Sequence, residues 1–138
     1  MKIPDTITDN ITDILVKIIS FTKSRHDILL KNINHVNDPD FLPKDMAVDE
    51  FSGLMNNAIN EHILNRRLLL CDTETIKFGT EGHFSVNPQV DNFAHDLLID
   101  NRDKYLELQV NKMMENSLNM KLAVQLLKQK EALNSMIE

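Results

Sequence analysis

The sequence contains very few of the residues that mark tight turns, disulfides or large aromatic cores. Its 138 residues include three glycines, four prolines, one tyrosine and no tryptophan. This scarcity, together with frequent leucine, isoleucine, methionine, asparagine and lysine, favours a mostly helical protein. A chain of this length fits one domain that is large enough to bury a sizeable core.

Cysteine and histidine are too sparse or too scattered to build a metal centre. Cys71 is the only cysteine, so it cannot form an intrachain disulfide and no cluster of thiolates can hold zinc. The five histidines form no His-Glu-x-x-His or Glu-x-x-His pattern, and His95 with Asp91 is the nearest approach to a pair. We therefore expect neither a metal nor a cofactor.

Motifs for binding phosphate or activating a nucleophile are missing as well. With glycine only at Gly53, Gly79 and Gly82, the chain has no Gly-x-Gly-x-x-Gly, no phosphate-binding loop and no Gly-x-Ser-x-Gly elbow. Acidic pairs such as Asp45 with Asp49 could act as acid and base, but charged helix faces account for them more simply. We therefore expect a protein that is not an enzyme.

The net charge and the length of the apolar runs argue against a nucleic-acid-binding protein and against a protein that inserts into a membrane. A net charge of −6 argues against a nucleic-acid binder, because neutralising phosphates needs a surplus of lysine and arginine. Near the N-terminus the apolar residues are interrupted by Asp5, Asp9 and Asp13, unlike the apolar region of a signal peptide. Apolar runs also fall well short of the roughly 20 residues that span a membrane, so we expect no direct membrane insertion.

Apolar residues recur every three or four positions in the first part of the chain, which places them on one helix face. They are Ile7, Ile11, Ile14, Ile18, Phe21 and Ile28. Pro39 and the polar residues before it stop the pattern, so we predict a helix over residues 6–36, about 45 Å long. Arg25, Asn32 and His35 continue the same face, and their polarity predicts more than one partner. An ordinary amphipathic helix with solvated last turns is the alternative.

The last part of the chain lacks proline and glycine and predicts a second long helix over residues 106–137. Two neighbouring apolar rows follow this helix. The first row contains Leu106, Val110, Met113, Met120, Val124 and Leu127, and the second contains Met114, Leu118, Leu122, Leu126 and Leu133. Together they form an arc wider than one helix–helix seam needs, so we expect more than one neighbour.

The segment between the long helices, residues 37–105, is predicted to hold shorter elements. Apolar residues keep a helical period over residues 47–69. Apolar alternation on both sides of Gly79–Gly82 predicts a small β-hairpin. We predict that residues 87–103 form a linking segment, which could include one helical turn around Leu97. We therefore predict a single, mainly α domain whose terminal helices pack as a coiled-coil-like pair.

The stretch from Asn32 to Phe41 resembles the Asn-Ile-Ala-Asn-x-x-Thr-Pro-Gly-Tyr signature of bacterial flagellar rod and hook proteins. The resemblance is carried by Asn32, Ile33, Asn37, Pro39 and Phe41, the last in place of the tyrosine. We call these residues the signature turn. The following Pro43, Lys44 and Asp45 are similar to the segment that comes after this signature in FlgB-type proximal-rod proteins.

A second stretch further along the chain is similar to the FlgB-type run Asp-Gly-Asn, Val-Asp-Leu-Asp-x-Glu and Asp-Asn-Ser-Leu. It comprises Asp100, Asn101, Leu106, Glu107, Gln109 and Glu115–Leu118. The two stretches cover about half of the chain in the family's order. Asp38 and Asp40 stand where the signature has threonine and glycine, and Met120 stands where the family often has tyrosine, so the geometry of the turn is left open.

The resemblance implies a subunit of the proximal rod that polymerises into a helical rod and transmits torque. Its implied partners are other flagellar rod proteins, the basal-ring protein and components of the export gate. Such a subunit reaches the periplasmic part of the basal body through the flagellar type III export apparatus, without a cleaved signal peptide.

On this interpretation the packing faces of the two terminal helices make the subunit contacts. The predicted packing residues are Ile11, Ile14, Ile18, Phe21, Met113, Leu118, Leu122, Val124, Leu126 and Leu127. The alternatives are another rod paralogue, a helical adaptor or export chaperone, and an enzyme or metal protein. An adaptor would share the amphipathic helices but would not need the signature turn.

Overall fold

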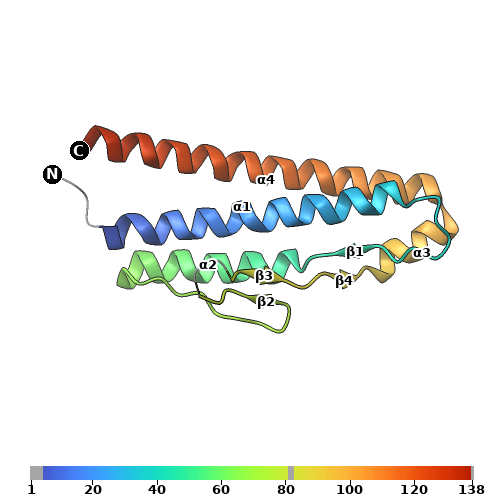
Figure 1. Cartoon of the computed structure of the whole chain (residues 1–138), viewed down its shortest axis with the longest axis horizontal. Helices are drawn as coiled ribbons and strands as arrows, with labels where there is room; N and C mark the ends of the chain where they lie inside the picture. The colour runs from blue at the N-terminus through green and yellow to red at the C-terminus, as the bar shows by residue number, and fades with distance from the viewer. Residues whose placement is uncertain (1–4, 81–82, 138) are drawn as a thin grey trace.

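Two long helices lie side by side and run antiparallel along an elongated molecule (Figure 1). They are α1 (Asp5–Asn34) and α4 (Arg102–Ile137). The computed structural model describes residues 5–80 and 83–137, with side chains from residue 10 to residue 136 within these ranges. The prediction of a mainly α chain whose terminal helices pack together is confirmed. Ile7, the first apolar residue of the predicted row, has its side chain outside the described part.

The other two helices pack around this pair. The helix α2 (Val48–Asn65) lies along α1 on the side away from α4, and the short α3 (Asn92–Asp100) lies at the end of the molecule opposite the start of α1 and the end of α4 (Figure 1). In the described part of the chain, none of the helices combines the length and apolar character that a bilayer crossing needs.

The predicted hairpin is present. Its strands are β2 (Ile76–Lys77) and β3 (Ser85–Val86), which pair antiparallel. Gly79 lies in the connecting turn at φ +61°, and a side chain at this position would collide with His83. Gly82, the other glycine of the predicted turn, lies outside the described residues.

A second antiparallel ladder was not predicted. It joins β1 (Lys44–Asp45), which follows the signature turn, to β4 (Gln89–Val90), which precedes α3. Asp91 N–H also donates to Pro43 O over 2.9 Å. This ladder brings two segments of the middle region together beside α1 and α4, where the charged residues described below meet.

The hydrophobic core lies between α1, α2 and the hairpin. Phe21 of α1 stacks on Phe51 of α2 with ring centroids 3.9 Å apart, and Phe78 stacks on Phe84 at 5.5 Å. The buried members of the core are Ile14, Phe21, Met46, Phe51, Met55, Ala58, Ile76 and Phe78. Burying a large apolar side chain contributes about 1.5–3 kcal/mol, so this cluster holds α2 and the hairpin on α1.

Local hydrogen bonds explain why the helix boundaries differ from the predicted ones. α2 stops at Asn65 rather than at residue 69, because Arg66 turns into the left-handed region with φ 57° and its N–H bonds to His62 O. α4 begins at Arg102 rather than at residue 106, because Asn101 Oδ1 accepts from Lys104 N–H over 3.1 Å and caps the helix.

Two more boundaries differ. α1 ends at Asn34 rather than at residue 36, and Val36 N–H then bonds to Ile33 O in a tight turn. The predicted linking segment holds the nine residues of α3 rather than a single turn, because Asp91 caps it by accepting from Ala94 N–H over 3.1 Å.

Candidate assembly surface

The signature turn is anchored by one buried side chain. Asn32 Nδ2 donates to Lys44 O over 2.8 Å and to Gln109 Oε1 over 3.0 Å, while Asn32 Oδ1 accepts from Lys44 N–H over 3.2 Å. The Tyr105 hydroxyl donates to Asn32 O over 2.8 Å. A single asparagine therefore joins α1, β1 and α4. We call these four residues the amide junction.

The other residues of the turn lie nearer the surface. Asn37 Oδ1 accepts from Arg102 Nη1 over 3.0 Å, which ties the turn to the first residue of α4. The Phe41 ring stacks on His35 with centroids 4.8 Å apart. The signature turn is thus fastened to α4 at two levels, one buried and one exposed.

The two aspartates that depart from the signature do not require unusual backbone geometry. Asp38 Oδ1 accepts from Asp40 N–H over 3.0 Å, a local bond typical of turns. Among the non-glycine residues in the described ranges, only Arg66 has a positive φ, so Asp40 replaces the glycine without a left-handed conformation. Ile33 is half-buried and Pro39 is exposed.

Beside the amide junction, four charged side chains form a cluster. Arg25 donates to both carboxylate oxygens of Asp45, over 2.9 Å from Nε and 3.1 Å from Nη2. Lys112 Nζ bridges Asp45 Oδ2 at 2.9 Å and Asp91 Oδ2 at 2.8 Å. The two positive and two negative charges balance, and together they connect α1, β1, α4 and the start of α3. We call these four residues the charge cluster.

The contacts within the charge cluster shift the pKa values of Asp45 and Lys112. Burial alone would raise the pKa of Asp45, but hydrogen bonds and charges from Arg25 and Lys112 outweigh it and hold this pKa below its usual value. Burial alone would lower the pKa of Lys112, and the two aspartates outweigh it, so this pKa lies above its usual value. Burial, with a smaller effect from Asp91, raises the pKa of the neighbouring Tyr105 to about 12. The Asp45 carboxylate and the Lys112 ammonium are therefore both charged near neutral pH.

The polar residues that interrupt the α1 row thus have partners within the chain. Arg25 is only 4% exposed and pairs with Asp45, while Asn32 belongs to the amide junction. The sequence predicted from these residues that α1 contacts more than one partner. α2, β1 and α4 of the same chain provide those partners.

The face of α4 toward α1 is polar or small rather than apolar. Its buried residues are Tyr105, Gln109, Asn116 and Ala123. Asn116 Nδ2 donates to Thr22 O over 2.7 Å. Gln109 and Asn116 were noticed in the sequence only through the second flagellar stretch, because a search for apolar periodicity passes over amides. The seven-residue spacing from Gln109 to Ala123 was the signal that could have found this seam.

The two predicted apolar rows of α4 flank this seam. The first row is half-buried apart from Val110, which is 45% exposed. The second row consists of Met114, Leu118, Leu122, Leu126 and Leu133, which are between 43% and 67% exposed. We call the second row the α4 row. Single exposed leucines are normal on a protein surface, but a continuous row along one helix is typical of an interface.

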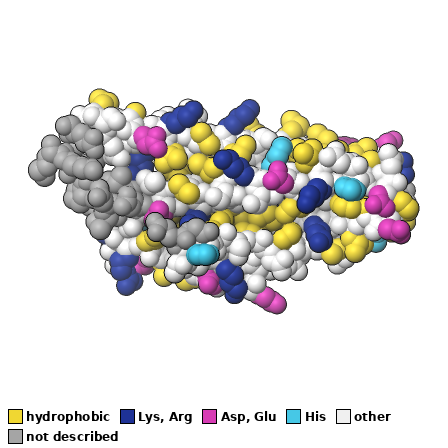
Figure 2. Space-filling model, in the orientation of Figure 1, with side chains coloured by type: hydrophobic (Ala, Val, Ile, Leu, Met, Phe, Trp, Pro, Cys, Tyr) yellow, Lys and Arg dark blue, Asp and Glu magenta, His cyan; other side chains and the backbone are white. Residues whose placement is uncertain are grey.

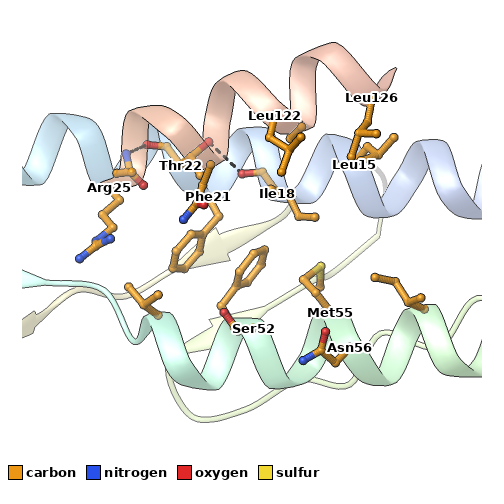
Figure 3. A pocket seen from close by; sticks show the side chains of 16 residues that line it. Leu15, Ile18, Phe21, Thr22, Arg25, Ser52, Met55, Asn56, Leu122 and Leu126 are labelled. Atoms are coloured by element: carbon orange, nitrogen blue, oxygen red, sulfur yellow. Dashed lines mark hydrogen bonds between the residues drawn. The ribbon is translucent and has the colours of Figure 1, made fainter. Parts of the chain in front are cut away.

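An apolar groove of about 290 Å³ lies beside the α4 row. Ile18 and Phe21 of α1 form its floor, Met55 points into it from α2, and Leu122 and Leu126 point into it from α4 (Figure 3). Hydrophobic side chains also show between the charged ones along the middle of the face seen in Figure 2. Leu122 and Leu126 belong to both the groove and the α4 row, and we take the groove and the row together as the candidate assembly surface.

The predicted packing residues fall into three environments. Ile14, Ile18 and Phe21 belong to the core or pack against it, because α2 covers the α1 row. Half-buried positions are Ile11, Met113, Val124 and Leu127. Exposed positions are Leu118, Leu122 and Leu126. In the single chain, therefore, the open apolar face belongs to α4 and not to α1.

Comparison with known proteins gave no family assignment. No protein-family model, no curated protein and no solved structure matched the chain. Within the described residues, no three His, Cys, Asp or Glu side chains come together as a group that could hold a metal ion.

Proposed function

We propose that the chain is a structural subunit of the bacterial flagellar basal body, of the FlgB type, which assembles into the proximal rod. The observation that carries this proposal is the α4 row, a line of large apolar side chains that the rest of the chain leaves exposed. In the rod, this row packs against helices of neighbouring subunits. The subunit has no catalytic role and holds no cofactor, and it transmits torque through these contacts.

A second observation supports the proposal. The two stretches that resemble rod proteins are far apart in the sequence, yet they meet in the amide junction, where Asn32 from the first contacts Gln109 from the second. Asn116 of the second stretch also bonds to Thr22 on α1. Residues that carry the resemblance therefore hold the two terminal helices against each other.

In this role the chain contacts neighbouring copies, other flagellar rod proteins, the basal-ring protein and components of the export gate. The location is the periplasmic part of the basal body, reached through the flagellar type III export apparatus.

The groove favours a second candidate function, that of a helical adaptor or export chaperone. Many helix-binding proteins receive an amphipathic helix in an apolar groove, and the groove between α2 and α4 has this form. An adaptor would act in the cytoplasm and would not be a component of the purified basal body. The two candidates therefore differ in where the chain is found.

An epitope-tagged chain in the strain that encodes it separates the candidates. For a rod subunit, we expect the tagged chain in purified basal bodies, and we expect deletion of the gene to abolish motility and leave basal bodies without a rod. A tagged cytoplasmic enzyme, expressed at the same level, controls for contamination. A tagged chain that is absent from basal bodies whose rods are complete would favour the adaptor.

A further inference from the structure

Two exposed patches that combine apolar and charged residues lie outside the candidate assembly surface. The first surrounds the end of α2 and consists of Ile63, Leu64, Arg66, Arg67, Leu68 and Leu69. Ile63 and Leu64 are 61% and 76% exposed. Arg67 pairs with Glu61, and within the described chain the Arg66 side chain has no partner. We call this the basic patch.

The second patch is the outer face of α3, formed by Phe93, Asp96, Ile99 and Asp100. Phe93 and Ile99 are 67% and 70% exposed, and neither aspartate has a partner within the described residues. Two basic residues lie close to this face in the sequence. Arg102 bonds to Asn37 of the signature turn, and Lys104 is exposed. Acidic side chains gather at this end of the molecule in Figure 2. We call this the acidic patch.

The two patches lie at opposite ends of the molecule. Asn10 Nδ2 donates to Arg66 O over 3.3 Å, so the basic patch lies next to the beginning of α1. Arg102 bonds to Asn37, so the acidic patch lies next to the end of α1 (Figure 1). A helix rises about 1.5 Å per residue, which puts roughly 40 Å between them. The patches of one chain therefore cannot contact each other.

We propose that the basic patch of one copy binds the acidic patch of the next copy, so that the chains associate head to tail. The two patches are complementary in apolar character and in charge. Ile63 and Leu64 of the basic patch would pack against Phe93 and Ile99 of the acidic patch. Arg66 would pair with the unpaired carboxylates of α3. Because the two patches differ, the contact is heterologous and leaves a free patch at each end of the product. Association therefore continues into open chains instead of stopping at a dimer.

This axial contact uses none of the residues of the α4 row. It can therefore fail while the proposed rod function stands, and it can exist in a protein that is not a rod subunit. Anionic lipid is the other surface that a basic, leucine-rich patch could suit. The acidic patch at the opposite end favours a second copy.

Charge reversal in the full chain tests the proposal. One variant carries Arg66→Glu with Arg67→Glu, and the other carries Asp96→Lys with Asp100→Lys. Sedimentation velocity at increasing concentration is expected to show wild-type chains growing beyond dimers, and each variant alone associating at least tenfold more weakly. An equal mixture of the two variants should associate again. The unchanged acidic patch of the arginine variant still complements the unchanged basic patch of the aspartate variant, and the two reversed patches complement each other.

Three controls make the result specific. Lys121→Glu with Lys128→Glu changes the net charge as much as the arginine variant, at exposed positions of α4, and should associate like wild type. Circular dichroism checks that each variant is folded. The series is repeated with Leu122→Asp, which removes any association through the α4 row. Wild-type chains that stay monomeric, variants that associate like wild type, or a mixture that stays dissociated would each overturn the proposal, as would binding to anionic vesicles without self-association.

Discussion

Asn32 on α1 and Gln109 on α4 share a buried hydrogen bond of 3.0 Å, although 77 positions separate them in the chain. Asn32 also bonds to both backbone groups of Lys44. A buried polar contact of this kind adds little net stability, but any other alignment of the helices would break the bond between Asn32 Nδ2 and Gln109 Oε1. We infer that the amide junction sets the register in which α4 lies on α1.

Replacing Asn32 should therefore be costly. Asn32→Ala removes the side-chain partner of Gln109 Oε1 and of both backbone groups of Lys44, and we expect the free energy of unfolding to fall by about 2–4 kcal/mol. Asn34→Ala, two positions along at an exposed site, is the matched control and should change it by less than about 0.5 kcal/mol. Urea unfolding followed by circular dichroism measures both. Equal effects would mean that the amide junction does not hold the fold.

Tyr105 gives an optical test of the same junction. The chain has one tyrosine and no tryptophan, so near-ultraviolet absorbance reports the ionisation of this phenol alone. We expect a pKa of about 12 in the folded chain against the usual 10.0, which unfolding in urea should restore. Because the folded pKa is raised, the contribution of Tyr105 to stability is complete below pH 10.0 and is lost as the pH rises toward 12. Folded-state ionisation near pH 10 would contradict its burial in the amide junction.

The charge cluster predicts a dependence on acid. The folded pKa of Asp45 lies below its usual 3.8, so its contribution to stability is complete above pH 3.8 and is lost as the pH falls through the folded pKa. Asp45→Asn should be less stable than wild type near neutral pH, and the difference should shrink below pH 3.8. Urea midpoints measured from neutral pH to about pH 2 test this.

Asp49→Asn is the control for this series, because Asp49 is exposed and lies four positions away on α2. It removes one negative charge outside the charge cluster, so its unfolding midpoint near neutral pH should stay close to that of wild type. A difference between wild type and Asp45→Asn that stays constant down to the lowest pH would show that the Asp45 carboxylate is not stabilised by Arg25 and Lys112.

The apolar pattern of the sequence was sufficient to predict α1, α2, α4 and the hairpin, but not α3. The row through Ile14 and Phe21 and the alternation around Gly79 arise from local geometry, which periodicity reports directly. Periodicity identifies a face but not what covers it. It therefore could not tell that α2 of the same chain covers the α1 row.

The polar contacts were not predictable in the same way. Lys112 meets Asp45 and Asp91 only because the ladder between β1 and β4 brings them together, and two-residue strands leave no recognisable pattern in a sequence. The seam of α4 is built from Gln109 and Asn116, whereas the apolar residues on which the sequence prediction relied flank it. The flagellar resemblance pointed to both amides, without indicating what they contact.

The distribution of buried residues also predicts how α4 behaves in solution. Beyond Ala123, no described residue of α4 is buried, whereas α1 has buried residues at intervals as far as Asn32. We expect fast amide hydrogen exchange from Val124 onward in the free chain, and slow exchange in α1 from Ile14 to Asn32. In assembled subunits the same part of α4 should become protected. Slow exchange along all of α4 in a proven monomer would indicate a self-contained bundle.

The central claim is that the α4 row joins this subunit to its neighbours in the rod. Leu118→Asp and Leu122→Asp place a charge at exposed positions, so the free chain should fold and be exported normally. In the rod the same charge would be buried without a partner, at a cost of several kcal/mol. Lys128→Glu, at an exposed position outside the row, is the matched control.

The most direct measurement is the amount of each variant in purified basal bodies, compared at matched levels of secretion. We predict that both aspartate variants are missing from the basal bodies and that their strains do not swim, while Lys128→Glu is incorporated like wild type. Incorporation of both aspartate variants at the level of the control would contradict the claim that the α4 row is an assembly surface.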